Sequence, residues 1–269
     1  ADAWQQQAVT MIQGIESLYG PYWTRRAEML LAASVGAAGS EDVEALTRIA
    51  RSHYARQDFA EAVDAYDRAG QAALGTGDAQ RGFDLLLAAA QTQRKHGDRA
   101  AAIERHRNLA LRLPANAKAA LVHLQATVDA AQVARDGTSD SLSAYVALLE
   151  EHIEHWPNEP SADQTRLWLA TLKEHQLDYA AALEAYRGVS AIDDKQFRIA
   201  IDGAARCYRE LLLQQRAGGR ETDGPGDRAA RYFENLLLAG DTRLPERFAP
   251  LDRRLALHAA RLRMQFTNE

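Results

Sequence analysis

The sequence has little of what staples or interrupts a protein chain. It contains a single cysteine, Cys207, among 269 residues, which excludes an internal disulfide and a zinc knuckle. Its 7 prolines and 17 glycines are too few for a collagen-like or a disordered chain. The longest apolar run, residues 85–90, is far shorter than the roughly 20 residues of a membrane-spanning helix. The packing of its apolar residues, 46% of the chain, is therefore expected to hold it together.

An excess of basic residues is also lacking. The chain has 37 acidic and 32 basic residues and a net charge of −5, which argues against a general nucleic-acid binder. Nearly all the basic residues are arginine, a bias that we attribute to a GC-rich genome rather than to the pairing of arginine with carboxylates. The chain begins at Ala1 without a methionine, so we expect a mature or excised fragment. Its compartment, cytoplasm or periplasm, stays open.

Helical periodicity is what the sequence has instead. Apolar side chains between residues 4 and 18 recur at spacings of three and four, the pattern of an amphipathic helix. The residues Tyr-Gly-Pro at 19–21 end this helix, and a second is expected from about residue 22 to 34. The sequence therefore predicts an N-terminal helical pair over residues 1–40.

A short turn recurs further along the chain. Residues 58–63 read Asp-Phe-Ala-Glu-Ala-Val, residues 178–183 read Asp-Tyr-Ala-Ala-Ala-Leu, and residues 97–103 carry a related version. Each copy follows one amphipathic stretch and opens another. A turn between two antiparallel helices, repeated along one chain, is typical of a helical solenoid.

The residues around these turns resemble the tetratricopeptide repeat, a pair of antiparallel helices of about 34 residues. The clearest unit matches that family's pattern at Leu46, Ile49, Ala50, Ala62, Tyr66 and Ala69. The resemblance implies an all-α fold, a right-handed superhelical array (α-solenoid) of antiparallel helix hairpins. We expect about five repeats within 41–244 (41–74, 80–114, 117–157, 161–194 and 196–240) and a C-terminal capping helix at 245–269.

Two of these expected features depart from a regular array. Tyr145 stands where the third repeat should carry an alanine, and residues 217–226 are expected to form a mobile loop in the fifth. Residues 156–160 (Trp-Pro-Asn-Glu-Pro) are similar to the linker between repeats in bacterial envelope tetratricopeptide proteins.

No residue cluster indicates a reaction. His152 and His155 lie three apart and could share a metal ion, but one helix supplies two ligands at most, so a solvated helix end is the favoured interpretation. Cys207 has no helper histidine nearby in sequence and is expected to be a buried structural thiol. We therefore expect no catalytic residue, no metal and no cofactor.

The resemblance places candidate binding residues on the inner face of the first helix of each repeat. The candidates for a peptide-binding groove are Arg51, Tyr54, Gln91, Arg94, Lys95, Glu174, His175, Arg198, Tyr208 and Arg209. The set is more basic than the chain as a whole, which indicates an acidic or carboxylate-bearing peptide. The alternative is that the arginines only solvate a helix face. The lysine and asparagine clamp of chaperone-binding members is not matched, because Thr47 and Arg51 stand in the first unit.

These observations predict a non-catalytic scaffold that binds a protein or peptide partner of unknown identity, and not a nucleic acid. Two alternatives stay open: a ligand-sensing helical-repeat domain of a bacterial regulator, and a helical accessory domain of a cell-envelope enzyme.

Overall fold

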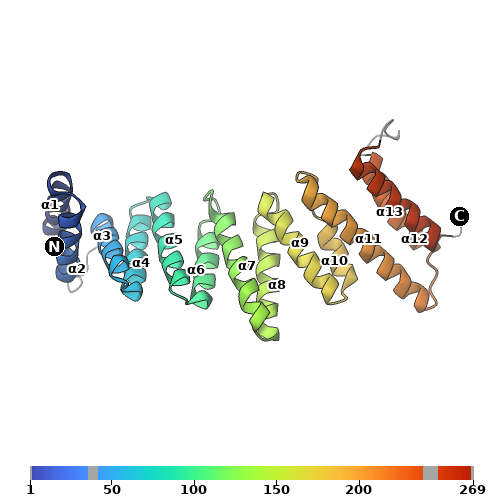
Figure 1. Ribbon diagram of the computed structural model, residues 1–269, viewed down its shortest axis with the longest axis horizontal. Helices are drawn as coiled ribbons and strands as arrows, with labels where there is room; N and C mark the ends of the chain where they lie inside the picture. Colours follow the sequence, from blue (N-terminus) through green and yellow to red (C-terminus); the bar gives the residue numbers. More distant parts are fainter. Residues whose placement is uncertain (1, 36–41, 239–247, 268–269) are drawn as a thin grey trace. The chain divides into compact units, whose positions relative to one another are not determined.

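The computed structural model describes residues 2–35, 42–238 and 248–267, and every regular element in these ranges is an α-helix (Figure 1). The chain divides into two compact units, residues 1–148 and residues 149–269, and each is described by itself. The predicted all-α fold, built of consecutive helices, is confirmed in both.

Unit 1 is a row of helices in which each packs on the next as far as α7. Its helices are α1 (Asp2–Tyr19), α2 (Pro21–Val35), α3 (Val43–Arg56), α4 (Phe59–Gly75), α5 (Ala79–Lys95), α6 (Arg99–Arg112), α7 (Ala119–Asp136) and the first part of α8 (Ser139–His155). Tyr145, the residue out of pattern in the third repeat, packs against a buried cluster that contains Ala126 and Ala130 of α7.

In unit 2, the described residues beyond the end of α8 form five helices. They are α9 (Pro160–His175), α10 (Tyr179–Arg187), α11 (Asp194–Ala217), α12 (Asp223–Leu238) and α13 (Pro250–Phe266). Helix α11 contacts both α9 and α13, α10 packs on α9 and α11, and α12 packs chiefly on α13. The first residues of the predicted capping helix, 245–247, lie outside the described residues, and the repeat boundaries within the array stay predictions.

One turn geometry recurs between helices, and it explains the repeated sequence motif. A residue with positive φ precedes an aspartate at four turns: Gln57–Asp58, Gly77–Asp78, Gly97–Asp98 and Leu177–Asp178. The side chain of Asp98 accepts a hydrogen bond from the Ala101 amide at 3.1 Å, an N-cap that satisfies a free donor of α6. Asp58 instead lies beside His53 and Arg56, at 3.5 and 3.1 Å.

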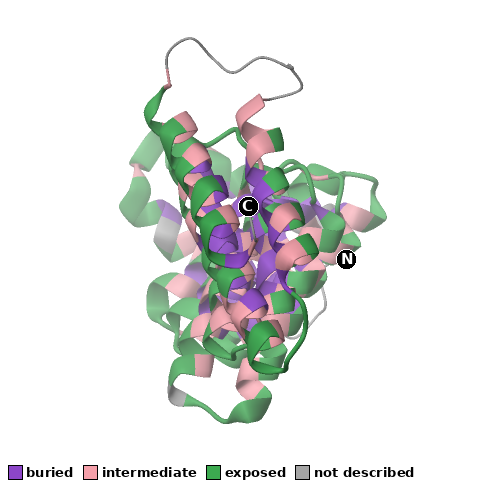
Figure 2. Ribbon diagram, turned by 90° about the vertical axis from the view of Figure 1, so that its right-hand side faces the viewer, coloured by how far each residue is buried: buried purple, intermediate pink, exposed green. Residues whose placement is uncertain are grey.

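Small residues bring neighbouring helices close together. Ala50 of α3 and Ala62 of α4, two of the residues that match the tetratricopeptide pattern, are completely buried. Gly70 and Gly82 do the same for α4 and α5, since a Cβ on either would lie within 3.2 Å of the other's carbonyl oxygen. Figure 2 shows the buried residues gathered between the helices, with exposed residues on their outer sides.

The expected mobile loop at 217–226 is shorter than predicted. Helix α11 ends at Ala217 and α12 already begins at Asp223, so Gly226 lies inside a helix. Gly226 is buried, and a Cβ there would lie 2.9 Å from the Cβ of Phe266. The glycine at position 226 therefore allows close packing against α13, and it does not belong to a loop.

Ion pairs connect alternate helices, skipping the one between. We name these the alternate-helix ion pairs: Glu44–Arg81 (α3–α5), Asp67–Arg105 (α4–α6), Arg94–Asp129 (α5–α7), Glu174–Arg206 (α9–α11) and Asp202–Arg254 (α11–α13). Each pair spans the junction between consecutive hairpins of one unit, which bears directly on the predicted binding residues.

Candidate binding surfaces

Two of the predicted binding residues, Tyr54 of α3 and Lys95 of α5, contact each other. Lys95 donates a hydrogen bond from Nζ to the Tyr54 hydroxyl at 2.7 Å and lies 5.3 Å from the centre of its ring. The guanidinium of Arg51 lies beside the Tyr66 hydroxyl, where it opposes the burial that raises the pKa of Tyr66. Gln91 is exposed and has no polar contact within the described residues.

Arg94 is engaged by a buried carboxylate. Its Nε donates to both oxygens of Asp129, at 2.9 and 2.7 Å, and Asp129 is fully buried on α7. The buried imidazole of His106 also feels the charge of Asp129, although burial is the larger influence and lowers the pKa of His106. An unpaired charge in this position is costly, so Arg94 compensates Asp129 and is a structural residue.

Glu174 is likewise held within the chain. Its carboxylate accepts two hydrogen bonds from Arg206, at 2.7 and 2.9 Å, and a third from the Tyr186 hydroxyl at 2.8 Å. The hydrogen bond from Arg206 is the main cause that lowers the pKa of Glu174, while burial raises the pKa of Tyr186 to about 12. The ring of Tyr186 lies directly on Gly203, where a Cβ would clash with it.

A groove of about 370 Å³ runs between α11 and α13, and Arg209 is the member of the predicted set that lines it. We name it the α11–α13 groove; it is lined by Asp202, Ala205, Arg206, Arg209, His258, Arg261, Leu262, Met264 and Gln265. Its charges are largely paired within the chain. Arg209 contacts Glu210 at 2.8 Å, and Asp202 contacts Arg254 and His258. Arg261 has no ion pair among the described residues.

The remaining predicted residues lie apart from this groove. Arg198 pairs with Asp194 on its own helix, and His175 is exposed at the end of α9. Tyr208, next to Arg209 in sequence, lies on another side of α11 against Tyr232 and Phe233 of α12. Within unit 2, the predicted residues therefore do not share one surface.

An apolar surface on α1 and α2 was missed by the sequence analysis. We name it the α1–α2 apolar surface; it consists of Met11, Leu18, Tyr19, Tyr22, Trp23 and Leu30, each between 53% and 75% exposed. A hollow of about 490 Å³, lined by Ile15, Tyr19, Trp23, Arg26, Ala27 and Leu30, lies within the hairpin. Elsewhere on the hairpin, Ile12 is buried with Ile49 of α3.

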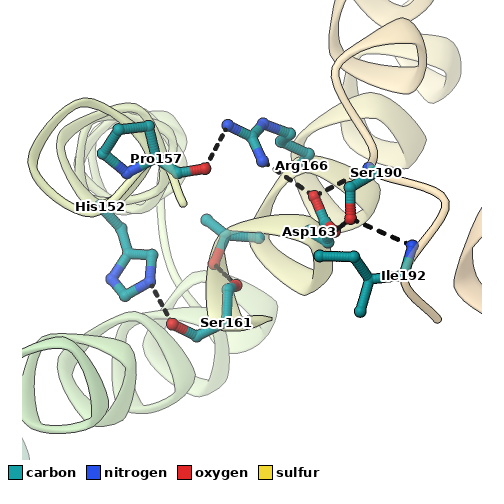
Figure 3. A network of polar contacts seen from close by, with 8 residues as sticks. His152, Pro157, Ser161, Asp163, Arg166, Ser190 and Ile192 are labelled. Atoms are coloured by element: carbon teal, nitrogen blue, oxygen red, sulfur yellow. Dashed lines mark hydrogen bonds and ion pairs between the residues drawn. The ribbon is translucent and has the colours of Figure 1, made fainter. Parts of the chain in front are cut away.

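His152 corrects one interpretation from the sequence. The solvated helix end expected for His152 and His155 is wrong for His152, which is completely buried, with its Nε2 3.0 Å from Ser161 Oγ (Figure 3). The reason is the short connection between α8 and α9, which brings the start of α9 onto the end of α8.

A polar network at the start of α9 also fixes the connection between α10 and α11. Asp163 accepts hydrogen bonds from Arg166 at 2.8 Å and from the Ser190 amide at 3.1 Å, and Arg166 donates to the Pro157 carbonyl at 2.9 Å (Figure 3). Asp163 is buried and its charge is paired, so the network holds the chain at both ends of the α9–α10 hairpin.

Cys207 is buried, as predicted, and burial raises the pKa of its thiol to about 12. In the part of the chain that the structure describes, no group of three His, Cys, Asp or Glu side chains could hold a metal ion. No helix in that part is long and apolar enough to cross a membrane.

These helices define an all-α protein built of consecutive helix hairpins. No family model matches the sequence, and the comparison with curated proteins gives no match. Among solved structures, the MamA protein is 16% identical over 77% of this chain and 98% of that chain, with a TM-score of 0.35. The assembly chaperone of RpL4, Acl4, is 16% identical over 96% of this chain and 95% of that chain, at 0.29. A circular tandem repeat protein is also 16% identical, over 96% of this chain and 62% of that chain, at 0.24. At such TM-scores these likenesses carry no argument, and the class of the chain rests on its own helices.

One signal for the missed features was present in the sequence. Asp129 falls on the apolar stripe of α7, at helical spacing from Val122 and Ala126, and a carboxylate on a core stripe needs a cationic partner. The exposure of the α1–α2 apolar surface had no such signal, because an amphipathic pattern does not tell which apolar residues the neighbouring helix covers.

Proposed function

We propose that the chain is a protein-binding scaffold without a catalytic step of its own. The observation that carries the proposal is the α1–α2 apolar surface. Of the thirteen large hydrophobic side chains exposed among the described residues, six lie on this one hairpin, between Met11 and Leu30. Contiguous exposed apolar patches are unfavourable in water and mark sites where another protein binds.

The expected occupant is the apolar face of an amphipathic helix in the partner protein. The hollow lies between two antiparallel helices, and its lining residues recur at spacings of three and four along them. A helix seats its apolar side chains in such a groove at the same spacing. The array itself uses this chemistry, since Ile12 of α1 is buried against Ile49 of α3.

The predicted groove residues enter the proposal as polar contacts at most. Tyr54, Lys95, Arg94 and Glu174 already have partners within the chain. Of the predicted set, Gln91 and His175 are exposed and make no hydrogen bond or ion pair within the described residues, and Arg261 in the α11–α13 groove makes no ion pair there.

The test begins with a photo-crosslinking amino acid in place of Tyr22, introduced in cells that express the full chain, and with identification of the crosslinked protein. Binding of that purified protein is then measured by calorimetry. The double variant Trp23→Ser, Leu30→Ser is expected to bind at least about tenfold more weakly, because a few large side chains supply most of the binding energy of an interface.

The matched control is Ile199→Ser, Leu257→Ser, which removes two exposed apolar side chains from α11 and α13. It is expected to bind like the wild type. Equal binding by both double variants, or crosslinks only to a second copy of the chain, would contradict the proposal.

A further inference from the structure

A second open pocket lies on a different side of α11 from the α11–α13 groove. It has a volume of about 540 Å³ and is lined by residues of α10, α11 and α12. We name it the α10–α12 pocket; its polar lining residues are Arg187, Tyr208, Gln215, Arg228, Arg231 and Tyr232, with Asn235 at the edge of α12. None of the side chains that line it is acidic.

The positive charge of this pocket is only partly compensated. Arg231 pairs with Asp227 at 2.8 Å, and the same carboxylate also contacts Arg263 at 2.8 Å. Arg187 lies over the Tyr232 ring, 5.1 Å from its centre, and has no carboxylate partner in the described structure. Arg228 has none there either. Two guanidinium groups from two helices therefore face one pocket without a counter-charge.

The pocket also offers an acceptor and an apolar floor. Gln215 lines the pocket, and its Oε1 is buried without a hydrogen-bond donor among the described residues. Leu211, Leu212, Pro225 and Ala229 line the pocket together with the rings of Tyr208 and Tyr232, which lie 5.7 Å apart. A bare anion would leave both the acceptor and the apolar lining without a partner.

We propose that the α10–α12 pocket binds an acidic peptide segment, in which a glutamate or aspartate stands beside an apolar residue. The carboxylate lies between Arg187 and Arg228, a peptide N–H donates to Gln215 Oε1, and the neighbouring apolar side chain packs on Tyr208 and Tyr232. Arginine suits this role because its guanidinium donates to a carboxylate through two parallel hydrogen bonds. The inference deepens the proposed function, on which it rests, by assigning a second site and a ligand chemistry to the scaffold.

The test is a selection of random twelve-residue displayed peptides on the full chain, followed by affinity measurements on the synthetic winners by fluorescence anisotropy. We expect enrichment of Glu or Asp next to Leu, Phe or Tyr. The Arg187→Gln, Arg228→Gln double variant should bind the winning peptide about tenfold or more weakly, since hydrogen bonds to charged groups are of that strength. Gln215→Leu should weaken it as well.

The matched control is Arg99→Gln, Arg135→Gln, which removes the same charge from exposed positions on α6 and α7. It is expected to bind like the wild type, and circular dichroism verifies that every variant is folded. Equal weakening by the control would reduce the effect to net charge and overturn the proposal.

Three ligand controls separate the occupants. A winning peptide with Gln in place of its acidic residues should not bind, and inorganic phosphate or succinate should not compete at the concentrations where the peptide does. Competition by these small anions, or binding only when a phosphoserine replaces the acidic residue, would also overturn the proposal.

The two proposals fail separately. If no acidic peptide is enriched while the Trp23→Ser, Leu30→Ser variant still loses its partner, only the pocket assignment falls. If the peptide binds as expected but no partner depends on the α1–α2 apolar surface, the apolar docking site falls instead.

Discussion

The α11–α13 groove and the α10–α12 pocket share helix α11 but use their arginines differently. In the groove, Arg206 is bound to Glu174 and Arg209 to Glu210, and Arg261 alone of its arginines has no ion pair among the described residues. In the pocket, Arg231 pairs with Asp227, whereas Arg187 and Arg228 have no carboxylate partner among the described residues. The difference teaches that arginine content does not identify a binding face in this chain. What matters is which arginines the fold has already compensated.

The difference between paired and unpaired arginines is expected to be largest in the free energy of unfolding at Arg94, because Arg94 pairs with the fully buried Asp129. Arg94→Ala should lower the free energy of unfolding by about 3 kcal/mol, because it leaves Asp129 buried without a counter-charge. Urea denaturation followed by circular dichroism measures the loss. The double variant Arg94→Leu, Asp129→Leu should recover most of it, and a loss below about 0.5 kcal/mol in Arg94→Ala would contradict the structural role.

Glu174 is expected to give the next largest effect. Glu174→Gln removes the negative charge that Arg206 and Tyr186 bind, and should cost about 1–2 kcal/mol at pH 7. Because the pKa of Glu174 is lowered in the folded chain, its contribution is present above the ordinary carboxyl pKa and is lost as the pH falls through the folded value.

The difference in unfolding free energy between wild type and Glu174→Gln should therefore shrink from pH 7 toward pH 3, as measured by urea titrations at each pH. A difference that is constant over this range would show that the charge of Glu174 does not contribute.

A smaller effect is expected at Asp202, whose partners Arg254 and His258 lie at the edge of the α11–α13 groove. Asp202→Asn should cost less than about 1 kcal/mol, since the pair is partly exposed to solvent. Thermal unfolding in low salt and in 1 M NaCl tests the cause, because salt screens exposed pairs. Equal costs in both buffers would speak for packing rather than charge.

The smallest effect on stability is expected at Arg228, one of the arginines without a carboxylate partner among the described residues. Arg228→Gln should change the free energy of unfolding by no more than about 0.5 kcal/mol, because it breaks no ion pair within the described chain. The same urea assay measures it. A loss as large as that of Arg94→Ala would remove the distinction between paired and free arginines.

The sequence predicts those features that depend on nearby residues. The turns at Asp58, Asp98 and Asp178 follow from local spacing, and the structure has them where they were expected. The state of each candidate binding residue could not be predicted in the same way. Arg94 meets a carboxylate 35 residues away and Glu174 an arginine 32 residues away, and such pairings depend on the lateral offset of two helices.

The alternate-helix ion pairs also determine how the array comes apart. In a repeat chain, stability divides into a term for each hairpin and a coupling term for each pair of neighbours. Pairs such as Asp67–Arg105 and Arg94–Asp129 belong to the coupling terms, since each joins helices of consecutive hairpins. Removing one pair would weaken the coupling between two consecutive hairpins of one unit. One of these hairpins could then unfold while its neighbour stays folded. Amide hydrogen exchange in the native state would then reveal a step in protection between adjacent hairpins.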